Sequence, residues 1–301
     1  MKYRIILLTL LLATTYCGSS DSEADTRPYV VATTGMVRDA AEQIGGDLFR
    51  IDGIMGPGVD PHLYRATPAD IRRMERADLL LYNGLLLEGR LAEILDRIGS
   101  RSFAVASAIP DSLLMAPYEF GGNYDPHIWF DVSLWKYAVN AIADQLIALA
   151  PEHEEAIRLR NEAYQHDLDE LHNYVTAQIA SIPEERRVLI TAHDAFGYFG
   201  RAYGMQVEGL QGISTASEYG LRDVRMMRDL IIERQIPAIF IETSISSRSI
   251  ESLIAGTREK GFQVKIGGEL YSDALGESGT ETGTYTGMFR HNADQITSAL
   301  K

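Results

Sequence analysis

The sequence is very poor in cysteine. Cys17 is the single cysteine among 301 residues, which excludes an intramolecular disulfide and a zinc site built from several thiolates. Positive charge is also scarce, because 28 lysines and arginines stand against 42 aspartates and glutamates, giving a formal net charge of −14. This balance argues against nucleic acid as a partner over a broad surface and is compatible with a cationic ligand. A transition-metal site in this chain must therefore use histidines and carboxylates.

Apolar runs long enough to span a membrane are missing as well. The run from Ile5 to Ala13 follows Lys2 and Arg4 and is far shorter than the roughly 20 residues of a membrane-spanning helix. This pattern predicts an export signal over 1–17 and a polar tether over 18–28. Cys17 ends the apolar region and suggests lipoprotein processing, although Tyr16 is bulkier than the residue usual before such a cysteine. We expect an exported protein, periplasmic or on the outer face of the cytoplasmic membrane, anchored by a lipid on Cys17.

From residue 29 onward, short apolar and β-branched runs alternate with amphipathic segments. The pattern predicts strands over 29–33, 48–54, 78–82 and 103–105, and again over 187–191, 206–210, 238–242 and 263–266. Helices are expected between them, over 36–44, 68–77, 87–98, 195–203, 221–235, 250–260 and 288–300. Such alternation is typical of parallel sheets with helices on both faces.

The strand signal disappears in the middle of the chain. Val132–Leu149 has the spacing of one helix, and no glycine or proline occurs from Glu152 to Ile182. A continuous helix over that second segment would measure about 46 Å, longer than one small domain needs. We therefore predict an α/β fold with two lobes, 29–150 and 183–301, joined by one long rigid helix over 151–182. A single large doubly wound domain is the alternative.

Three of the seven histidines stand at predicted strand-to-loop junctions. His62 and His127 each end an Asp-Pro-His triplet, at 60–62 and 125–127, and His193 follows a predicted buried strand. Ligands of open α/β sheets bind beyond the carboxyl ends of the strands, and a proline stiffens the turn that presents the next side chain. These three imidazoles are our candidate metal ligands. The other histidines fall on predicted helices and read as surface or local structure: His153, His166, His172 and His291.

A fourth ligand is expected from a carboxylate at a strand end of the second lobe. Glu242 ends one predicted strand, and Asp273 follows the segment Gly267–Ser272. Either side chain could instead cap local structure or support another ligand, so the residue pattern leaves both open.

Four motifs together resemble the zinc- and manganese-binding solute receptors of bacterial ABC importers. They are Val-Asp-Pro-His at 59–62, Asp-Pro-His-Ile-Trp at 125–129, Thr-Ala-His-Asp-Ala-Phe-Gly-Tyr-Phe at 191–199 and Ile-Gly-Gly-Glu-Leu-Tyr-Ser-Asp at 266–273. The likeness covers nearly all of residues 29–301. It implies a metal site in the cleft between two lobes, with His62 and His127 from the first lobe and His193 and Asp273 from the second. It also implies a monomer that carries one Zn²⁺ or Mn²⁺ to a membrane permease, with no nucleic-acid partner.

Zinc and manganese are both compatible with this ligand set. Three imidazoles and one carboxylate suit zinc, while a bidentate Asp273 would raise the coordination number toward what manganese accepts. Strict manganese receptors of the family often have glutamate where His193 stands, which favours zinc. Zinc-specific members often carry a histidine-rich loop in the first lobe, and residues 116–124 contain no histidine. A receptor for both ions is therefore plausible.

Two other classes of protein remain as alternatives. A zinc hydrolase with three histidine ligands needs an open coordination position and a nearby base. Asp273 as a fourth ligand would close that position, Glu242 is the only candidate base, and no His-Glu-x-x-His motif occurs. A surface adhesin would fit an exported, tethered chain but leaves the four motifs without a role. We therefore predict a binding protein and not an enzyme.

Overall fold

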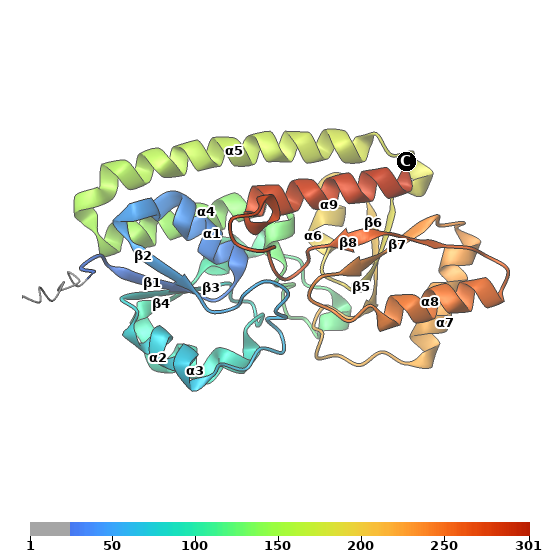
Figure 1. Cartoon of the computed structure of the whole chain (residues 1–301), viewed down its shortest axis with the longest axis horizontal. Helices are drawn as coiled ribbons and strands as arrows, with labels where there is room; N and C mark the ends of the chain where they lie inside the picture. Colours follow the sequence, from blue (N-terminus) through green and yellow to red (C-terminus); the bar gives the residue numbers. More distant parts are fainter. Residues whose placement is uncertain (1–24) are drawn as a thin grey trace, which may run out of the picture.

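The computed structural model describes residues 25–301, which form an elongated α/β molecule (Figure 1). The predicted export signal over 1–17, Cys17 and most of the polar tether lie outside the described residues. Among residues 25–301, no helix is both long and apolar enough to cross a membrane.

The N-terminal lobe is built on a four-stranded parallel sheet with the strand order β2-β1-β3-β4. Its strands are β1 (Tyr29–Ala32), β2 (Arg50–Gly53), β3 (Leu79–Tyr82) and β4 (Ser102–Ala104). One face is covered by α1 (Gly35–Gly45) and α4 (Val132–Leu149), and the other by α2 (Pro68–Arg76) and α3 (Ala92–Ile98) (Figure 1). Cover on both faces explains the run of buried leucines at the start of β3.

The C-terminal lobe repeats this layering with two strand pairs. β5 (Val188–His193) is parallel to β6 (Gln206–Gln211), β7 (Ala238–Glu242) is parallel to β8 (Lys265–Leu270), and β5 lies beside β7. Helices α7 (Leu221–Glu233) and α8 (Arg248–Glu259) cover one face, and α6 (Gly197–Tyr203) and α9 (Tyr285–Leu300) cover the other (Figure 1). All strand pairs formed by the described residues are parallel. The predicted α/β fold is confirmed, and the described strands form three separate sheets instead of the one continuous sheet of a doubly wound domain.

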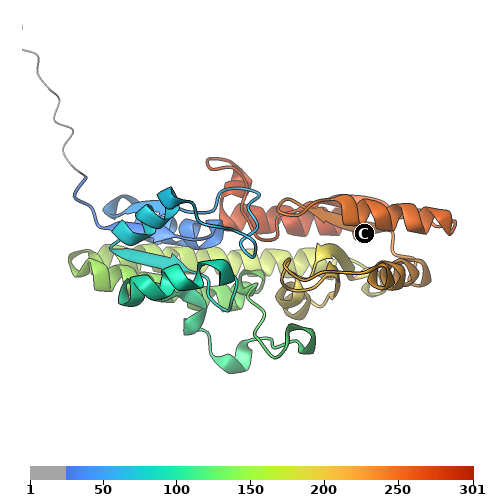
Figure 2. The same cartoon turned by 90° about the horizontal axis from the view of Figure 1, so that it is seen from below.

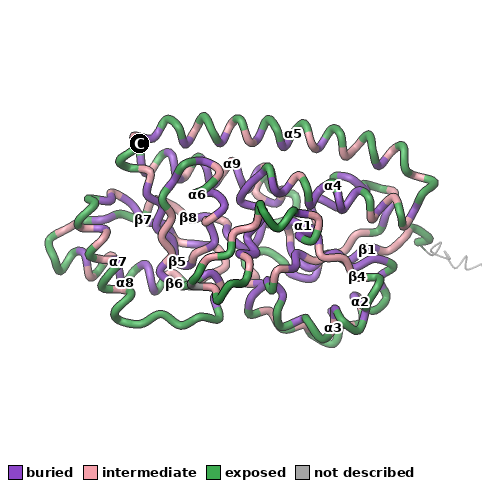
Figure 3. The backbone as a smooth tube through the Cα atoms, turned by 180° about the vertical axis from the view of Figure 1, so that it is seen from behind, coloured by how far each residue is buried: buried purple, intermediate pink, exposed green. Residues whose placement is uncertain are grey.

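One helix runs the length of both lobes. α5 (Glu154–Ala180) has 27 residues, about 40 Å at the usual helical rise, and it lies along both lobes in two perpendicular views (Figures 1 and 2). Its buried side chains recur at helical spacing along one face: Ile157, Tyr164, Leu168, Leu171, Val175 and Ile179. The opposite face is exposed to solvent (Figure 3). The helix is therefore amphipathic and is held by packing along one face.

The largest hydrophobic core is continuous between the lobes. It joins Trp135 of α4, Leu168 of α5 and Phe289 of α9 with Phe240 on β7. Each lobe has one further, smaller hydrophobic cluster, on the face of its sheet that points away from α5. Because a wide hinge motion would break the shared core under α5, the two lobes are expected to move little relative to each other.

The N-terminus of α2 shows how local sequence sets an element. Thr67 accepts a hydrogen bond from the Asp70 N–H, the Asp70 carboxylate accepts one from the Thr67 N–H, and Pro68 occupies the first turn. Helix α3, in contrast, begins at Ala92 and not at Leu87 as the periodicity predicts. Residues 89–91 form a short 3-10 helix, and Glu88 before them has φ −90° and ψ 42°, outside the α-helical region.

Candidate metal centre

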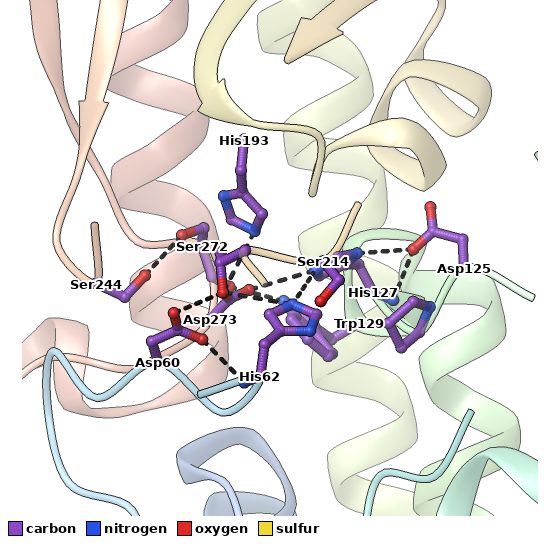
Figure 4. A network of polar contacts seen from close by, with 12 residues as sticks. Asp60, His62, Asp125, His127, Trp129, His193, Ser214, Ser244, Ser272 and Asp273 are labelled. Atoms are coloured by element: carbon purple, nitrogen blue, oxygen red, sulfur yellow. Dashed lines mark hydrogen bonds and ion pairs between the residues drawn. The ribbon is translucent and has the colours of Figure 1, made fainter. Parts of the chain in front are cut away.

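Four buried side chains meet between the two lobes. His62, His127, His193 and Asp273 each offer one ligand atom, and these atoms all lie within 4.8 Å of one another. Figure 4 shows the three imidazoles converging on the Asp273 carboxylate. The two exposed fractions that are not zero are small, 6% for His62 and 2% for Asp273. The four residues singled out from the sequence are thus brought together at one point.

The topology explains this convergence. His62 lies in the loop after β2 and His127 in the loop after β4, while His193 is the last residue of β5 and Asp273 follows β8. The carboxyl ends of the strands of both lobes point toward the middle of the molecule (Figure 1). Side chains at these ends therefore face one another across the boundary between the lobes, as expected for ligand sites of open α/β sheets.

The spacing of the ligand atoms fits a small cation. His62 Nε2 lies 3.3 Å from His127 Nε2, and Asp273 Oδ2 lies 3.3 Å from His193 Nε2. Two further separations are 3.5 Å from His127 Nε2 to Asp273 Oδ1 and 3.9 Å from His62 Nε2 to Asp273 Oδ2. Ligand atoms bound 2.0–2.1 Å from a tetrahedral zinc ion are about 3.4 Å apart. A zinc-sized ion fits the centre with little rearrangement.

The same atoms lack ordinary hydrogen-bond partners. Among the described residues, His193 Nε2 and both carboxylate oxygens of Asp273 are buried and form no hydrogen bond of normal geometry. Leaving such groups unpaired is costly in a protein interior. A bound cation would satisfy all three atoms at once.

The ionisable side chains of the site shift one another's pKa values. Burial would raise the pKa of Asp273, but the imidazoles of His193 and His127 hold it well below its usual range. Burial lowers the pKa of His62 to about 3. For His127 the effect of burial is outweighed by Asp125, so that the pKa rises to about 9. The Asp273 carboxylate is therefore ionised, as a metal ligand must be.

Two of the imidazoles are oriented from behind by carboxylates. Asp125 Oδ1 lies 2.7 Å from His127 Nδ1, and Glu242 Oε2 lies 2.6 Å from His193 Nδ1. Glu242 and Asp273 together raise the pKa of His193 well above its usual value despite its burial. With the proton on Nδ1, the lone pair of Nε2 is directed at the shared centre, an arrangement common behind metal-bound histidines. Glu242 is thus placed behind His193, away from the four converging atoms.

The two Asp-Pro-His triplets differ in what their aspartates do. Asp60 and Asp125 each accept a hydrogen bond of 2.9 Å from the backbone N–H of the histidine two residues on. Only Asp125 also reaches the imidazole of its triplet, whereas Asp60 accepts a bond from the Thr215 hydroxyl at 2.7 Å. The repeated motif predicted the stiff turn in both cases but did not distinguish these roles.

Further hydrogen bonds join the lobes next to the site. The Trp129 indole N–H donates to the carbonyl of Ser272 at 3.0 Å, and the Tyr285 hydroxyl donates to the carbonyl of Trp129 at 2.7 Å. Thr215 and Asp60 connect the lobes at the edge of the centre. Local sequence does not predict these contacts, because each one joins segments far apart in the chain.

The remaining histidines lie elsewhere in the molecule. His153 and His166 are on the helical connection, and His172 Nδ1 contacts the Tyr203 hydroxyl at 3.3 Å. His291 lies inside α9 and contacts the carbonyl of Glu269 at 3.1 Å. None of the four reaches the cluster between the lobes.

The chain is similar to known proteins along nearly its whole length. "Manganese-binding lipoprotein MntA" of Bacillus subtilis (strain 168) is 50% identical over 299 residues, which cover 98% of this chain and 97% of the relative. "Zinc-binding protein TroA" of Treponema pallidum (strain Nichols) is 48% identical over 98% of this chain and 96% of its own length. The solved structure of the periplasmic zinc-binding protein TroA from Treponema pallidum superposes with a TM-score of 0.89, at 48% identity over 91% of this chain and 99% of that one.

A family model provides the assignment for the chain as a whole. The model described as zinc-uptake complex component A, periplasmic, matches residues 30–299. This match spans both lobes, the long helix and all four converging residues, in agreement with the resemblance carried by the four sequence motifs. The chain belongs to the family of periplasmic zinc-uptake complex component A.

Proposed function

We propose that this protein captures one divalent transition metal ion, zinc or manganese, outside the cytoplasm and delivers it to the membrane permease of an ABC importer. The observation that carries the proposal is the buried cluster of three imidazole nitrogens and one carboxylate within 4.8 Å of one another. His62 and His127 would bind the ion from the N-terminal lobe, and His193 and Asp273 from the C-terminal lobe.

Zinc is the ion that the ligand set favours. Three neutral nitrogens and one carboxylate at tetrahedral separations suit Zn²⁺, whereas Mn²⁺ prefers more oxygen ligands and a higher coordination number. The names of the relatives point to both metals, because the MntA relative is described as manganese-binding and the TroA relative as zinc-binding. We therefore propose zinc as the preferred ion and manganese as a second one that binds when Asp273 supplies both oxygens.

Capture and release would take place with small movements of the lobes. We divide the chain into an N-terminal lobe over 29–150, a linking helix over 151–182 and a C-terminal lobe over 183–301. The core shared beneath α5 supports limited closure. Export by the segment 1–17, anchoring through a lipid on Cys17 and action as a monomer complete the proposal, and the relative named as a lipoprotein supports the anchor.

We also propose that the protein is not an enzyme. A catalytic zinc ion keeps a coordination position open for water, and here Asp273 would occupy the fourth position. Glu242, the candidate base, is engaged by the Nδ1 atom and the backbone N–H of His193. A surface adhesin would need neither arrangement.

The experiment is metal analysis and titration of purified protein. Wild type should bind one Zn²⁺ or Mn²⁺ per chain, and each of His62→Ala, His127→Ala, His193→Ala and Asp273→Ala should bind more weakly. His166→Ala is the matched control, because His166 is exposed on α5 and outside the cluster. Undiminished affinity in all four site variants would refute the ligand assignment. Competition between Zn²⁺ and Mn²⁺ on one sample decides the preferred metal.

A further inference from the structure

A fully buried glutamate lies in the N-terminal lobe near the metal centre but outside it. Glu88, with 3% of its surface exposed, follows β3. Its Oε1 accepts hydrogen bonds from the Thr33 hydroxyl at 2.7 Å and from the Asn83 N–H at 2.8 Å. Its Oε2 accepts one from the Gly84 N–H at 3.1 Å. The carboxylate therefore connects the residue after β1 with the residues after β3.

Asn83 continues this network to a candidate metal ligand. Its side-chain amide donates to the carbonyl of Pro126 at 2.9 Å, and Pro126 is bonded directly to His127. The backbone carbonyl of Asn83 in turn accepts a hydrogen bond of 3.1 Å from the N–H of Ala106, which lies just beyond β4. Asn83 is buried, so these bonds form in a medium where they are strong and where their loss is costly.

Thr33 extends the network toward the other histidine of this lobe. Its hydroxyl is held by Glu88, and its carbonyl accepts from the Met55 N–H at 2.9 Å. Met55 opens the loop that leads from β2 to His62. Glu88 is thus connected by hydrogen bonds to the loops of both N-lobe histidines. The connection to the loop of His62 runs through Thr33, and the connection to the loop of His127 runs through Asn83.

The chain adopts an unfavourable conformation to place Glu88 there. Gly84, Leu85 and Leu86 have successive φ angles of 89°, 53° and 66°. Left-handed backbone is disfavoured for leucine, and such strain persists only where the surroundings hold it in place. The turn brings Glu88 back onto the N–H groups of Asn83 and Gly84, which accounts for the late start of α3.

We propose that Glu88 is a positioning residue for the metal site, acting through Asn83 and Pro126 on His127 and through Thr33 on the loop of His62. The inference rests on the proposed metal-binding function. Glu88 touches no ligand atom itself, and its role is to set where the two N-lobe imidazoles stand. Removing such outer support typically weakens metal binding by about 10- to 100-fold.

The test compares two buried carboxylates of equal exposure. Glu88→Gln keeps the size of the side chain but replaces one acceptor oxygen with an NH₂ group that faces a backbone donor. Asp39→Asn is the control for burial, because Asp39 is also 3% exposed and its hydrogen-bond donors, Gln43, Tyr164 and the Tyr285 N–H, lie outside the loops that carry His62 and His127. Asn83→Ala is the second variant. It removes the hydrogen bond from the Asn83 side-chain amide to the Pro126 carbonyl while leaving the Glu88 carboxylate in place.

Three quantities are measured on each full-length variant: the Zn²⁺ Kd by chelator competition, the visible d–d spectrum of the Co²⁺-loaded protein and the urea midpoint. We expect Glu88→Gln and Asn83→Ala to raise the Kd about tenfold or more and to shift the Co²⁺ bands. Asp39→Asn should lower the urea midpoint only. If Glu88→Gln does not fold, Asn83→Ala carries the test.

Two results would overturn the proposal, and they are distinguishable. If wild type binds the metals but both variants keep its Kd and Co²⁺ spectrum, Glu88 is merely structural and the proposed function stands. If wild type binds neither Zn²⁺ nor Mn²⁺, the proposed function fails first and the positioning role fails with it.

Discussion

Glu242→Gln is the substitution whose effect on metal binding can be worked out most closely from the structure. Glu242 Oε1 accepts from the His193 backbone N–H at 2.9 Å, and Oε2 pairs with His193 Nδ1 at 2.6 Å. Both oxygens therefore serve as acceptors, and both facing groups of His193 are donors. Glutamine has nearly the same shape but offers one oxygen only.

Either orientation of the glutamine amide is unfavourable. If its oxygen faces Nδ1, its NH₂ group opposes the backbone N–H of His193 in a fully buried setting. If its NH₂ group faces Nδ1, the imidazole must move its proton to Nε2 and can no longer bind a cation through that atom. Losing one hydrogen bond to a charged group costs about 1.5–3 kcal/mol, which corresponds to a roughly 10- to 100-fold weaker metal affinity.

The assay is the Zn²⁺ Kd by competition with a chromophoric chelator at neutral pH. Glu269→Gln is the control, because Glu269 is exposed on β8 next to the end of β7. Urea unfolding of the metal-free proteins separates loss of affinity from loss of fold. A Glu242→Gln protein that folds and binds Zn²⁺ as tightly as wild type would refute the reasoning, since it would mean that the proton position on His193 has no influence on binding.

Three further predictions concern pH, the interlobe contacts and a helix cap. In metal-free protein Asp125 raises the pKa of His127 to about 9, so protonated His127 stabilises the fold at low pH and this stabilisation is lost as the pH rises from about 6.5 to 9. The increase in Tm on adding Zn²⁺ should therefore grow over that range. An increase in Tm that does not depend on pH would contradict this prediction. Trp129→Phe removes the hydrogen bond from the indole N–H to the Ser272 carbonyl. It should weaken Zn²⁺ binding and abolish the Zn²⁺-dependent change in tryptophan fluorescence, whereas Trp135→Phe should keep that change. Loss of the fluorescence change in Trp135→Phe instead would contradict the role given to Trp129. Thr67→Ala removes the N-cap of α2 and should lower the free energy of unfolding, measured by urea titration, by about 1 kcal/mol. The Zn²⁺ Kd should stay unchanged. A changed Kd would show that α2 is coupled to the site.

Local pattern was sufficient wherever the energetics are local. The helix over Val132–Leu149 and the strand over Ala238–Glu242 have the predicted bounds, because apolar periodicity and the flanking residues determine both. The long helix also forms, from Glu154 to Ala180, where no glycine or proline interrupts it. Periodicity failed over 87–91, since the buried Glu88 carboxylate is held by the N–H groups of Asn83 and Gly84 and the backbone of Glu88 lies outside the α-helical region.

The sequence by itself determined the parallel α/β layering, the stiff turns before His62 and His127 and the position of His193 at a strand end. The residue pattern alone left Glu242 and Asp273 equivalent, because both are carboxylates at the ends of strands of the same lobe. The resemblance to the receptor family indicated Asp273, and the tertiary structure gives the physical distinction by placing Asp273 among the three Nε2 atoms and Glu242 behind His193. The physical reason is that strand order and lobe packing decide which side of a sheet edge faces the partner lobe, and these arise from contacts between segments far apart in the chain.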